Sequence, residues 1–153
     1  MNIRIAEESD IPELAALYEK TVLAIAPQRY SQAQTEMWAS FASNASFHEF
    51  ILNPTTFVAT DETGIVGFAA IAEDGHVNSA YVRCDRIHQG IGSTLMQHVL
   101  DYAKNHNIQR LYAEASEFSL GLFKKFGFHL YDTEIVDRQG VKFKRYLVER
   151  NLS

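Results

Sequence analysis

The spacing of apolar residues predicts three helices in the first third of the chain. One helical face is formed by residues that recur every three or four positions: Leu14, Leu17, Tyr18, Val22 and Ile25. Ser9 and Asp10 offer capping side chains before this run, and Pro27 ends it. Ser31 can cap a second helix, and a shorter helical segment runs over residues 47–52.

Alternation of apolar and polar residues predicts strands in the rest of the chain. The predicted strands cover residues 2–5, 56–59, 65–72, 76–83, 110–115, 128–136 and 141–149. Turn-forming residues at 61–64, 73–75 and 138–140 connect antiparallel neighbours. Helical periodicity returns at residues 92–106 and 118–126. This order predicts an α/β protein in which a mixed, mostly antiparallel central sheet is flanked by helices.

Composition narrows the classes of function. Of the 153 residues, 46% are apolar and 22% charged, so we expect one domain over residues 1–153. The net charge of −5 argues against nucleic-acid binding as the main task, which calls for clustered Lys and Arg. The single cysteine, Cys84, excludes an intrachain disulfide, and neither a signal peptide nor a membrane span is recognisable. We therefore expect a soluble, cytoplasmic protein that binds neither nucleic acid nor a membrane.

The segment from Tyr81 to Leu95 carries the most informative pattern. A strand leads through a bend into His88-Gln89-Gly90-Ile91-Gly92 and a helix start. Glycine lets a ligand approach the backbone, and the first amides of a helix attract anions. A tight strand-to-helix turn without a ligand is the alternative interpretation. The pattern is neither a Walker A sequence nor a full dinucleotide-binding fingerprint.

The same segment resembles the coenzyme A-binding motif of the GCN5-related N-acetyltransferase (GNAT) family. In that family a strand ending in Tyr-Val leads through a bend into Gly-x-Gly, as it does here from Tyr81-Val82 onward. The strand Ile65-Val66-Gly67-Phe68 and the downstream segment ending in Phe126-Gly127-Phe128 agree with the family as well. The resemblance spans nearly the whole chain and implies the acyl-CoA N-acyltransferase fold.

The resemblance also implies which residues bind acetyl-CoA. The backbone of Tyr81, Val82 and Arg83 should bind the pantetheine arm. Amides of the segment that follows should hold the pyrophosphate: His88, Gln89, Gly90, Ile91, Gly92, Ser93 and Thr94. Arg83, Arg86 and Lys124 are candidates for the outer phosphates, with a solvated surface charge as the alternative for each.

Two positions depart from the family pattern near the expected thiol site. Phe118 replaces an Asn that often contacts the cofactor, and Phe123 replaces the Tyr commonly credited with protonating the departing thiolate. Phe cannot donate a proton. This departure keeps a second interpretation open, a non-catalytic CoA-binding or sensing domain, and a nucleotide-binding regulatory domain is a weaker third.

The expected chemistry is direct attack of a primary amine on the thioester, for which the amine has to be neutral. His76 stands where related acetyltransferases carry a base, and an ordinary histidine pKa near ~6.5 suits that task. Asn78 lies two residues further along the predicted strand and could orient a water. A hydrogen-bonded structural histidine is the alternative for His76.

The acceptor site is less well marked. Tyr30 and Trp38 lie in the region that shapes the acceptor pocket in this fold, although core packing is the alternative for Trp38. Glu73, Asp74 and Glu114 could attract a cationic amine. The other histidines have no metal-ligand spacing, so we expect no metal. The sequence leaves open whether the acceptor is a small molecule or a protein, and whether the chain forms a homodimer.

Overall fold

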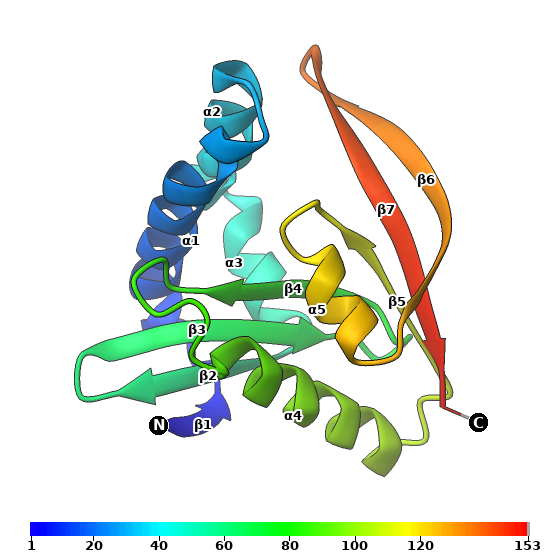
Figure 1. Ribbon diagram of the computed structural model, residues 1–153. Helices are drawn as coiled ribbons and strands as arrows, with labels where there is room; N and C mark the ends of the chain where they lie inside the picture. The colour runs from blue at the N-terminus through cyan, green and yellow to red at the C-terminus, as the bar shows by residue number, and fades with distance from the viewer. Residues whose placement is uncertain (153) are drawn as a thin grey trace.

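The computed structural model describes residues 1–152 (Figure 1). In chain order the longer elements are β1 (Asn2–Ile5), α1 (Ile11–Ile25), α2 (Gln32–Ser40), α3 (Ser46–Leu52), β2 (Thr55–Asp61), β3 (Gly64–Ile71), β4 (Val77–Val82), α4 (Ile91–Asn105), β5 (Arg110–Ala115), α5 (Leu120–Lys125), β6 (His129–Arg138) and β7 (Val141–Asn151). This confirms the predicted α/β class, and the predicted elements are all present with ends that differ by a few residues. Residues 1–152 include no helix that is long and apolar enough to span a membrane.

The strands form two antiparallel sheets rather than one continuous sheet. One has the order β1-β2-β3-β4 and the other β5-β7-β6. They meet where β4 and β5 run parallel, through a single bridge between His76 and Tyr112 and a 3.1 Å hydrogen bond from the Tyr112 amide to the Gly75 carbonyl. Beyond that point β4 and β5 diverge (Figure 1), so the facing edges of both strands keep unpaired backbone groups.

The four-stranded sheet buries both faces. Helix α4 covers one face through Leu95, Met96 and Val99, which pack on β2 and β3. Helices α1 and α3 cover the other face, where Leu14 and Phe47 pack around Phe68. All of these side chains are at most 2% exposed, and each contributes about 1.5–3 kcal/mol of hydrophobic stabilisation. The packing fixes the start of α4 relative to the end of β4.

The two expected helix caps turned out differently. Ser31 caps α2 as predicted, since its Oγ accepts a 3.1 Å hydrogen bond from the Gln34 amide. Asp10 precedes α1 but makes no side-chain cap bond to it, because its carboxylate binds Arg4 at 2.7 and 2.8 Å and the Glu7 amide at 2.8 Å. The capping interpretation of Asp10 was therefore wrong, and its carboxylate ties α1 to β1 instead.

Candidate functional site

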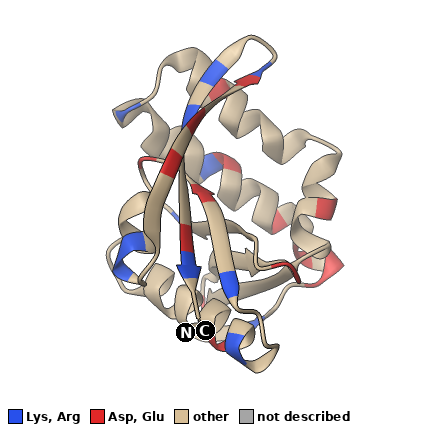
Figure 2. Cartoon of the chain, turned by 90° about the vertical axis from the view of Figure 1, so that its right-hand side faces the viewer, with Lys and Arg blue, Asp and Glu red and all other residues tan. Residues whose placement is uncertain are grey.

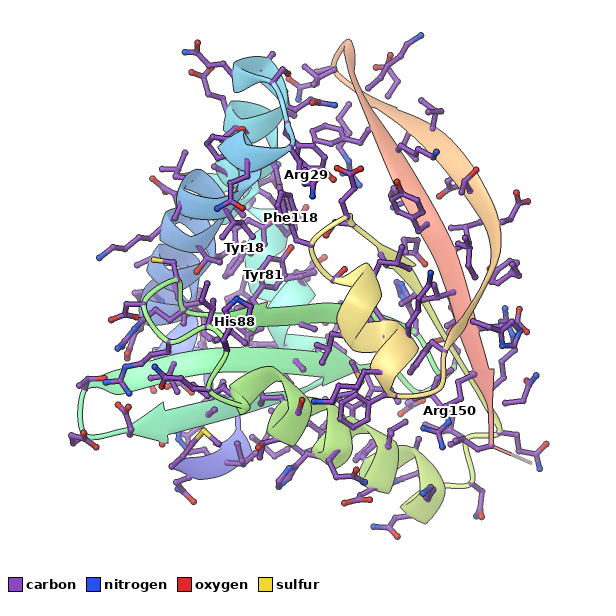
Figure 3. All side chains as sticks on the ribbon, viewed as in Figure 1. Tyr18, Arg29, Tyr81, His88, Phe118 and Arg150 are labelled. Atoms are coloured by element: carbon purple, nitrogen blue, oxygen red, sulfur yellow. The ribbon has the colours of Figure 1, made fainter. Side chains whose placement is uncertain are left out.

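A cavity of about 1060 Å³ occupies the space where β4 and β5 diverge. Its wall is built by α1, α2, the start of α4, α5 and the β6–β7 hairpin. In Figure 3, Tyr18, Tyr81 and Phe118 lie between α1 and the hairpin, and His88 lies lower, towards the start of α4. The cavity therefore connects the predicted phosphate-binding turn with the predicted acceptor residues.

The start of α4 offers unpaired amides to the cavity. Gly90 caps the helix with φ of 83°, and His88 holds φ of 62°, a conformation that residues other than glycine seldom adopt. Within residues 1–152 the amides of Ile91, Gly92 and Ser93 donate to no protein acceptor, as expected for the first turn of a helix. The positive end of the helix dipole adds to their attraction for an anion.

The predicted binding segment is shorter than expected. The Thr94 amide donates a 3.0 Å hydrogen bond to the Gly90 carbonyl, so it is already used by the helix. Neither Thr94 nor Gln89 contributes to the cavity wall. His88 and Gly90 also line the cavity, and within residues 1–152 their amides donate to no protein acceptor, so the unpaired amides of this turn include those of His88 and Gly90 as well as residues 91–93, without Thr94.

The edge of β4 corrects the expectation for the pantetheine arm. The Arg83 amide donates to the Val66 carbonyl at 2.8 Å, and Tyr81 lies two residues earlier, opposite Phe68. Backbone groups alternate in direction along a strand, so those of Tyr81 and Arg83 point towards β3. The groups of Val82 and Ala80 point away from β3, where the Val82 carbonyl accepts a long 3.4 Å hydrogen bond from Thr21 Oγ1. The edge therefore stays open at Ala80 and at the Val82 amide, and it is closed at the backbone of Tyr81 and Arg83.

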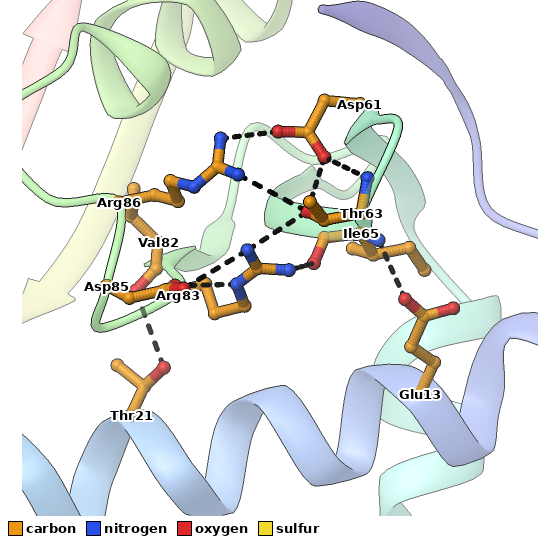
Figure 4. A network of polar contacts seen from close by, with 9 residues as sticks. All are labelled: Glu13, Thr21, Asp61, Thr63, Ile65, Val82, Arg83, Asp85 and Arg86. Atoms are coloured by element: carbon orange, nitrogen blue, oxygen red, sulfur yellow. Dashed lines mark hydrogen bonds and ion pairs between the residues drawn. The ribbon is translucent and has the colours of Figure 1, made fainter.

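The two arginines of the bend are held by carboxylates (Figure 4). Arg83 Nε donates to Asp85 Oδ1 at 2.6 Å and Arg83 Nη2 to Thr63 Oγ1 at 3.0 Å. Arg86 pairs with Asp61, the last residue of β2 before the β2–β3 turn. The network ties the bend to this turn. Arg86 still reaches the cavity wall, whereas Arg83 does not.

The lysine that lies beside the unpaired amides of α4 is Lys125, whereas the predicted Lys124 lies outside the cavity wall. Lys125 Nζ donates a 2.8 Å hydrogen bond to Ser93 Oγ, beside the unpaired amides of α4. Lys124 is exposed and does not line the cavity. Helical period explains the difference, since Lys125 lies one turn after Leu122, another cavity residue. The helical spacing between Leu122 and Lys125 was thus a sequence signal for Lys125, whereas the resemblance to the family motif pointed to Lys124.

His76 and Glu114 form a polar pair on facing strands. His76 Nε2 lies 2.9 Å from Glu114 Oε1, and the His76 ring stacks on Tyr112 at 4.8 Å between centroids. The hydrogen bond from His76 holds the pKa of Glu114 below its ordinary value, aided by the charge of Arg145, although burial opposes the shift. An ionised carboxylate only accepts hydrogen bonds, so the His76 proton sits on Nε2 and Nδ1 is left as the basic atom.

The turn before β4 fixes the position of His76. The Asp74 carboxylate accepts hydrogen bonds from the His76 amide at 3.1 Å and from the Tyr112 hydroxyl. The bond to Asp74 raises the pKa of Tyr112 to about 12. Asp74 therefore orients the strand start, and it does not line the cavity. Glu73 is exposed on the same turn and lies outside the cavity too, which contradicts its prediction as an acceptor residue.

Asn78 lies at a bulge of β4. Ala70 pairs with Ser79 and Ile71 with Val77, which leaves Asn78 as an extra residue opposite β3. Its Nδ2 donates a long 3.4 Å hydrogen bond to the Phe50 carbonyl, and its buried Oδ1 has no protein partner among residues 1–152. Asn78 lines the cavity as expected. An unpaired buried oxygen there marks a place where a water or ligand donor would be stabilised.

Aromatic side chains wall the far end of the cavity. Tyr30 lies 5.6 Å from Trp38, 5.5 Å from Phe118 and 5.9 Å from Phe143 between ring centroids. Trp38 Nε1 donates a 3.2 Å hydrogen bond to the Tyr81 hydroxyl. The structure thus brings the predicted Tyr30, Trp38 and Phe118 together. Phe143 was not anticipated, because its place depends on the folding back of β7.

Phe123 is both a core residue and part of the cavity wall. It is 3% exposed, and its ring packs edge-on against Phe128 at 5.0 Å. It nevertheless contributes to the lining beside Leu122. No hydroxyl stands at this position to protonate a leaving group. The described part of the chain also has no cluster of three or more His, Cys, Asp or Glu side chains that could hold a metal ion.

Comparisons with known proteins agree with this geometry. A family model described as an acetyltransferase (GNAT) domain matches residues 26–149. The chain is 23% identical over 146 residues to an uncharacterized N-acetyltransferase of Escherichia coli (strain K12), YafP, covering 95% of this chain and 93% of that protein.

Solved structures share the fold over nearly the full length. A GCN5-related N-acetyltransferase from Rhodopseudomonas palustris superposes with a TM-score of 0.93 at 25% identity, covering 99% of this chain and 95% of that one. The PaiA N-acetyltransferase from Thermoplasma acidophilum, solved in complex with coenzyme A, gives a TM-score of 0.79 at 19% identity, covering 99% of both chains.

Proposed function

Because the chain belongs to the GNAT acetyltransferase family and is thus an acetyl-CoA-dependent acyltransferase, we propose that it transfers the acetyl group to a primary amine by direct attack. One observation carries the proposal. A single cavity runs from the unpaired amides of α4 to the His76–Glu114 pair, so an anion-binding end and a proton-accepting end share one space.

The residues present fit the cosubstrate. The amides of Ile91, Gly92 and Ser93 would hold the pyrophosphate, with Lys125 and Arg86 nearby to balance its charge. The backbone of Ala80 and the amide of Val82, which point away from β3, would pair with the amide-containing pantetheine arm. Both contacts would use main-chain groups, so they depend little on the side chains of the bend.

In the proposed reaction His76 Nδ1 accepts a proton from the ammonium group of the acceptor, which leaves a neutral, nucleophilic amine. That nitrogen bonds to the thioester carbonyl carbon, the carbon–sulfur bond breaks, and the nitrogen gives up its second proton through water to the departing coenzyme A thiolate. Glu114 is a positioning residue, since it fixes the tautomer and the ring of His76. Phe123 supplies no proton, which suits a leaving group with a thiol pKa near ~8.5.

Steady-state thiol release with a panel of amines tests the proposal, alongside calorimetric binding of coenzyme A. We expect amine-dependent release of one thiol per acetylated product. Saturable binding of acetyl-CoA without turnover on any amine would favour a CoA-binding or sensing domain and would overturn the transferase proposal.

Replacing His76 by Ala should lower kcat by roughly 100- to 10,000-fold and leave coenzyme A affinity nearly unchanged. Glu114→Gln should lower kcat less, because a glutamine can still accept the hydrogen bond from Nε2. His129→Ala is the matched control, since His129 is exposed at the start of β6 and lies outside the cavity. Equal activity of the His76 and His129 variants from pH 6 to 9 would show that His76 is not the base and has only a structural role.

A further inference from the structure

Helix α5 lies along the cavity between its two ends. At the C-terminal end of α5, Lys125 Nζ lies 2.8 Å from Ser93 Oγ, beside the unpaired amides of α4. At the other end, Ser119 directly precedes the helix and follows the short loop that leaves β5. The six residues of α5 are about 9 Å long. A ligand that reaches from the anion site to the His76–Glu114 pair would therefore run along α5, with its reacting end towards Ser119.

The loop between β5 and α5 begins beside the His76–Glu114 pair. Ser116 is two residues after Glu114, so their Cα atoms are at most about 7 Å apart. Ser119 Oγ lies 3.0 Å from the Ser116 amide, and both serines line the cavity. Phe123 follows one helical turn later, since its amide donates a 3.2 Å hydrogen bond to the Ser119 carbonyl. The two serines thus lie between the proton-accepting end and the position where no tyrosine hydroxyl is present.

The hydrogen bonds of the loop fix which serine is the donor. Ser116 Oγ accepts hydrogen bonds from two amides, that of Phe118 at 3.1 Å and that of Ser119 at 3.2 Å. A hydroxyl oxygen has two acceptor lone pairs and one donor hydrogen, so Ser116 Oγ has no further acceptor capacity. In the 3.3 Å contact between the two hydroxyls, Ser116 is therefore the donor and Ser119 the acceptor.

The hydrogen of the Ser119 hydroxyl is left without an acceptor. Ser119 Oγ accepts from the Ser116 amide and from the Ser116 hydroxyl, which uses both of its lone pairs. Within residues 1–152 its own hydroxyl donates to no other group. Glu117, the one carboxylate of the loop, accepts instead a 3.5 Å hydrogen bond from the Tyr146 hydroxyl. Because the bonds it accepts polarise the Ser119 hydroxyl, it is a strengthened donor on the cavity wall.

The cations near the two ends of α5 are already paired. Both charge signs occur along the β6–β7 hairpin (Figure 2), and its Arg145 bridges Glu134 and Glu114. Lys125 is held beside the start of α4. This arrangement leaves a neutral donor, the Ser119 hydroxyl, to meet a negative charge that develops between these ends.

We infer that the Ser119 hydroxyl donates a hydrogen bond to the coenzyme A sulfur as the carbon–sulfur bond breaks, and this inference rests on the proposed transferase function. The electron pair of that bond passes to sulfur, and a donor held in place stabilises the charge as it develops. The serine keeps its own proton, because an alcohol is a much weaker acid than a thiol. The proton that sulfur finally takes still comes from the amine nitrogen through water. Ser116 is a positioning residue, since its amide and hydroxyl fill both lone pairs of Ser119.

The thiol pKa of bound coenzyme A measures this hydrogen bond directly. A donor to the thiolate lowers that pKa, so Ser119→Ala should raise it by roughly one unit or more relative to the parent. The ultraviolet absorbance of the thiolate follows the titration of coenzyme A with the protein in excess. The spectrum of the protein alone is subtracted, which removes the signals of Cys84 and the tyrosines. This measurement requires neither an acceptor nor turnover.

Turnover gives a second measurement. Ser119→Ala should lower kcat by roughly 10- to 100-fold and leave the KM for acetyl-CoA nearly unchanged, because the hydrogen bond strengthens only as charge develops on the departing sulfur. Ser119→Thr keeps the hydroxyl, so it should restore both kcat and the thiol pKa of bound coenzyme A.

Ser31→Ala is the matched control for the loss of a serine that binds a loop amide. Ser119 Oγ accepts the Ser116 amide, and Ser31 Oγ accepts the Gln34 amide at 3.1 Å, but Ser31 lies outside the cavity wall. Both alanine variants should show a lower Tm, whereas only Ser119→Ala should change the thiol pKa. If Ser119→Ala does not fold, Ser119→Gly removes the same hydroxyl, and glycine is well tolerated before the first residue of a helix.

The outcomes separate this inference from the function on which it rests. A thiol pKa that rises in Ser119→Ala and returns in Ser119→Thr would support the hydrogen bond to sulfur. An unchanged thiol pKa in Ser119→Ala, or an equal rise in Ser31→Ala, would overturn the role of Ser119 and leave the transferase proposal intact. If no amine is acetylated, the transferase proposal fails, and the titration still decides whether the Ser119 hydroxyl binds the sulfur.

Discussion

Phe123 offers a test of how the thiol end of the cavity is built, through the exchange of Phe123 for Tyr. The two rings differ by one hydroxyl, so the outcome depends on what that hydroxyl meets. Phe123 contributes to the cavity wall, whereas its neighbour Phe128, equally buried at 3%, does not. Phe128→Tyr is thus a matched control in which the added hydroxyl enters the core.

The stabilities of the two variants should differ measurably. A buried hydroxyl without a partner costs about 1–3 kcal/mol, which the Phe128 variant should lose. In a chain of 153 residues that loss corresponds to a Tm decrease of roughly 2–12 °C. The Phe123 variant should lose less than about 1 kcal/mol, because water in the cavity can satisfy its hydroxyl.

Turnover provides the second measurement. A tyrosine hydroxyl beside the sulfur would protonate the departing thiolate, so kcat of Phe123→Tyr should rise by up to roughly 10-fold below about pH 8.5, the pKa range of a thiol. The gain should shrink at higher pH, where the thiolate leaves without a proton. If Phe123→Tyr loses as much stability as Phe128→Tyr and its turnover falls, the edge of the ring at position 123 points into the core and does not face the thiol.

Two further predictions concern binding and stability. A Cβ on Gly92 would meet the Val82 and Leu122 side chains at an ordinary 3.5 Å, so Gly92→Ala should fold and gain about 0.5–1 kcal/mol of stability. The bulkier Gly92→Val should weaken the coenzyme A affinity measured by calorimetry by roughly 10-fold or more. An unchanged affinity of Gly92→Val would show that the pyrophosphate does not bind at this turn. The hydrogen bond from Arg4 lowers the pKa of Asp10 below its ordinary 3.8, so the stability it supplies is present above that pH and lost as the pH falls through the lowered value. Asp10→Asn should therefore cost about 1–2 kcal/mol in urea unfolding at pH 7 and progressively less as the pH is lowered below 3.8, and a cost that does not fall with pH would contradict the ion-pair account.

The sequence by itself determined the elements, and it also predicted the turn to which we assign phosphate binding. Apolar residues that recur every three or four positions predicted α1 and α4, and the capping residue Ser31 predicted the start of α2. Both signals depend only on residues a few positions apart. The same locality made the amides at Gly90–Gly92 predictable. A strand, a glycine with positive φ and a helix start are consecutive in the chain, so their meeting needs no other part of the fold.

Where prediction from sequence failed, a contact outside the local pattern decided the outcome. Asp10 has the chemistry of a cap, but Arg4, six residues earlier on β1, competes for its carboxylate. The backbone of Arg83 was expected to bind a ligand, but pairing with β3 uses its amide. Lys124 and Lys125 are adjacent in sequence; helical spacing from Leu122 favours Lys125, and the docking of α5 beside α4 brings it to Ser93.

The charged residues at the acceptor end of the cavity are brought together by tertiary structure alone. Glu114 pairs with His76 because β4 and β5 meet at one parallel bridge, and Arg145 reaches the same carboxylate because β7 folds back beside β5. Charges at positions 114 and 145 carry no local pattern, since long-range sheet pairing, rather than spacing along the chain, sets their neighbours.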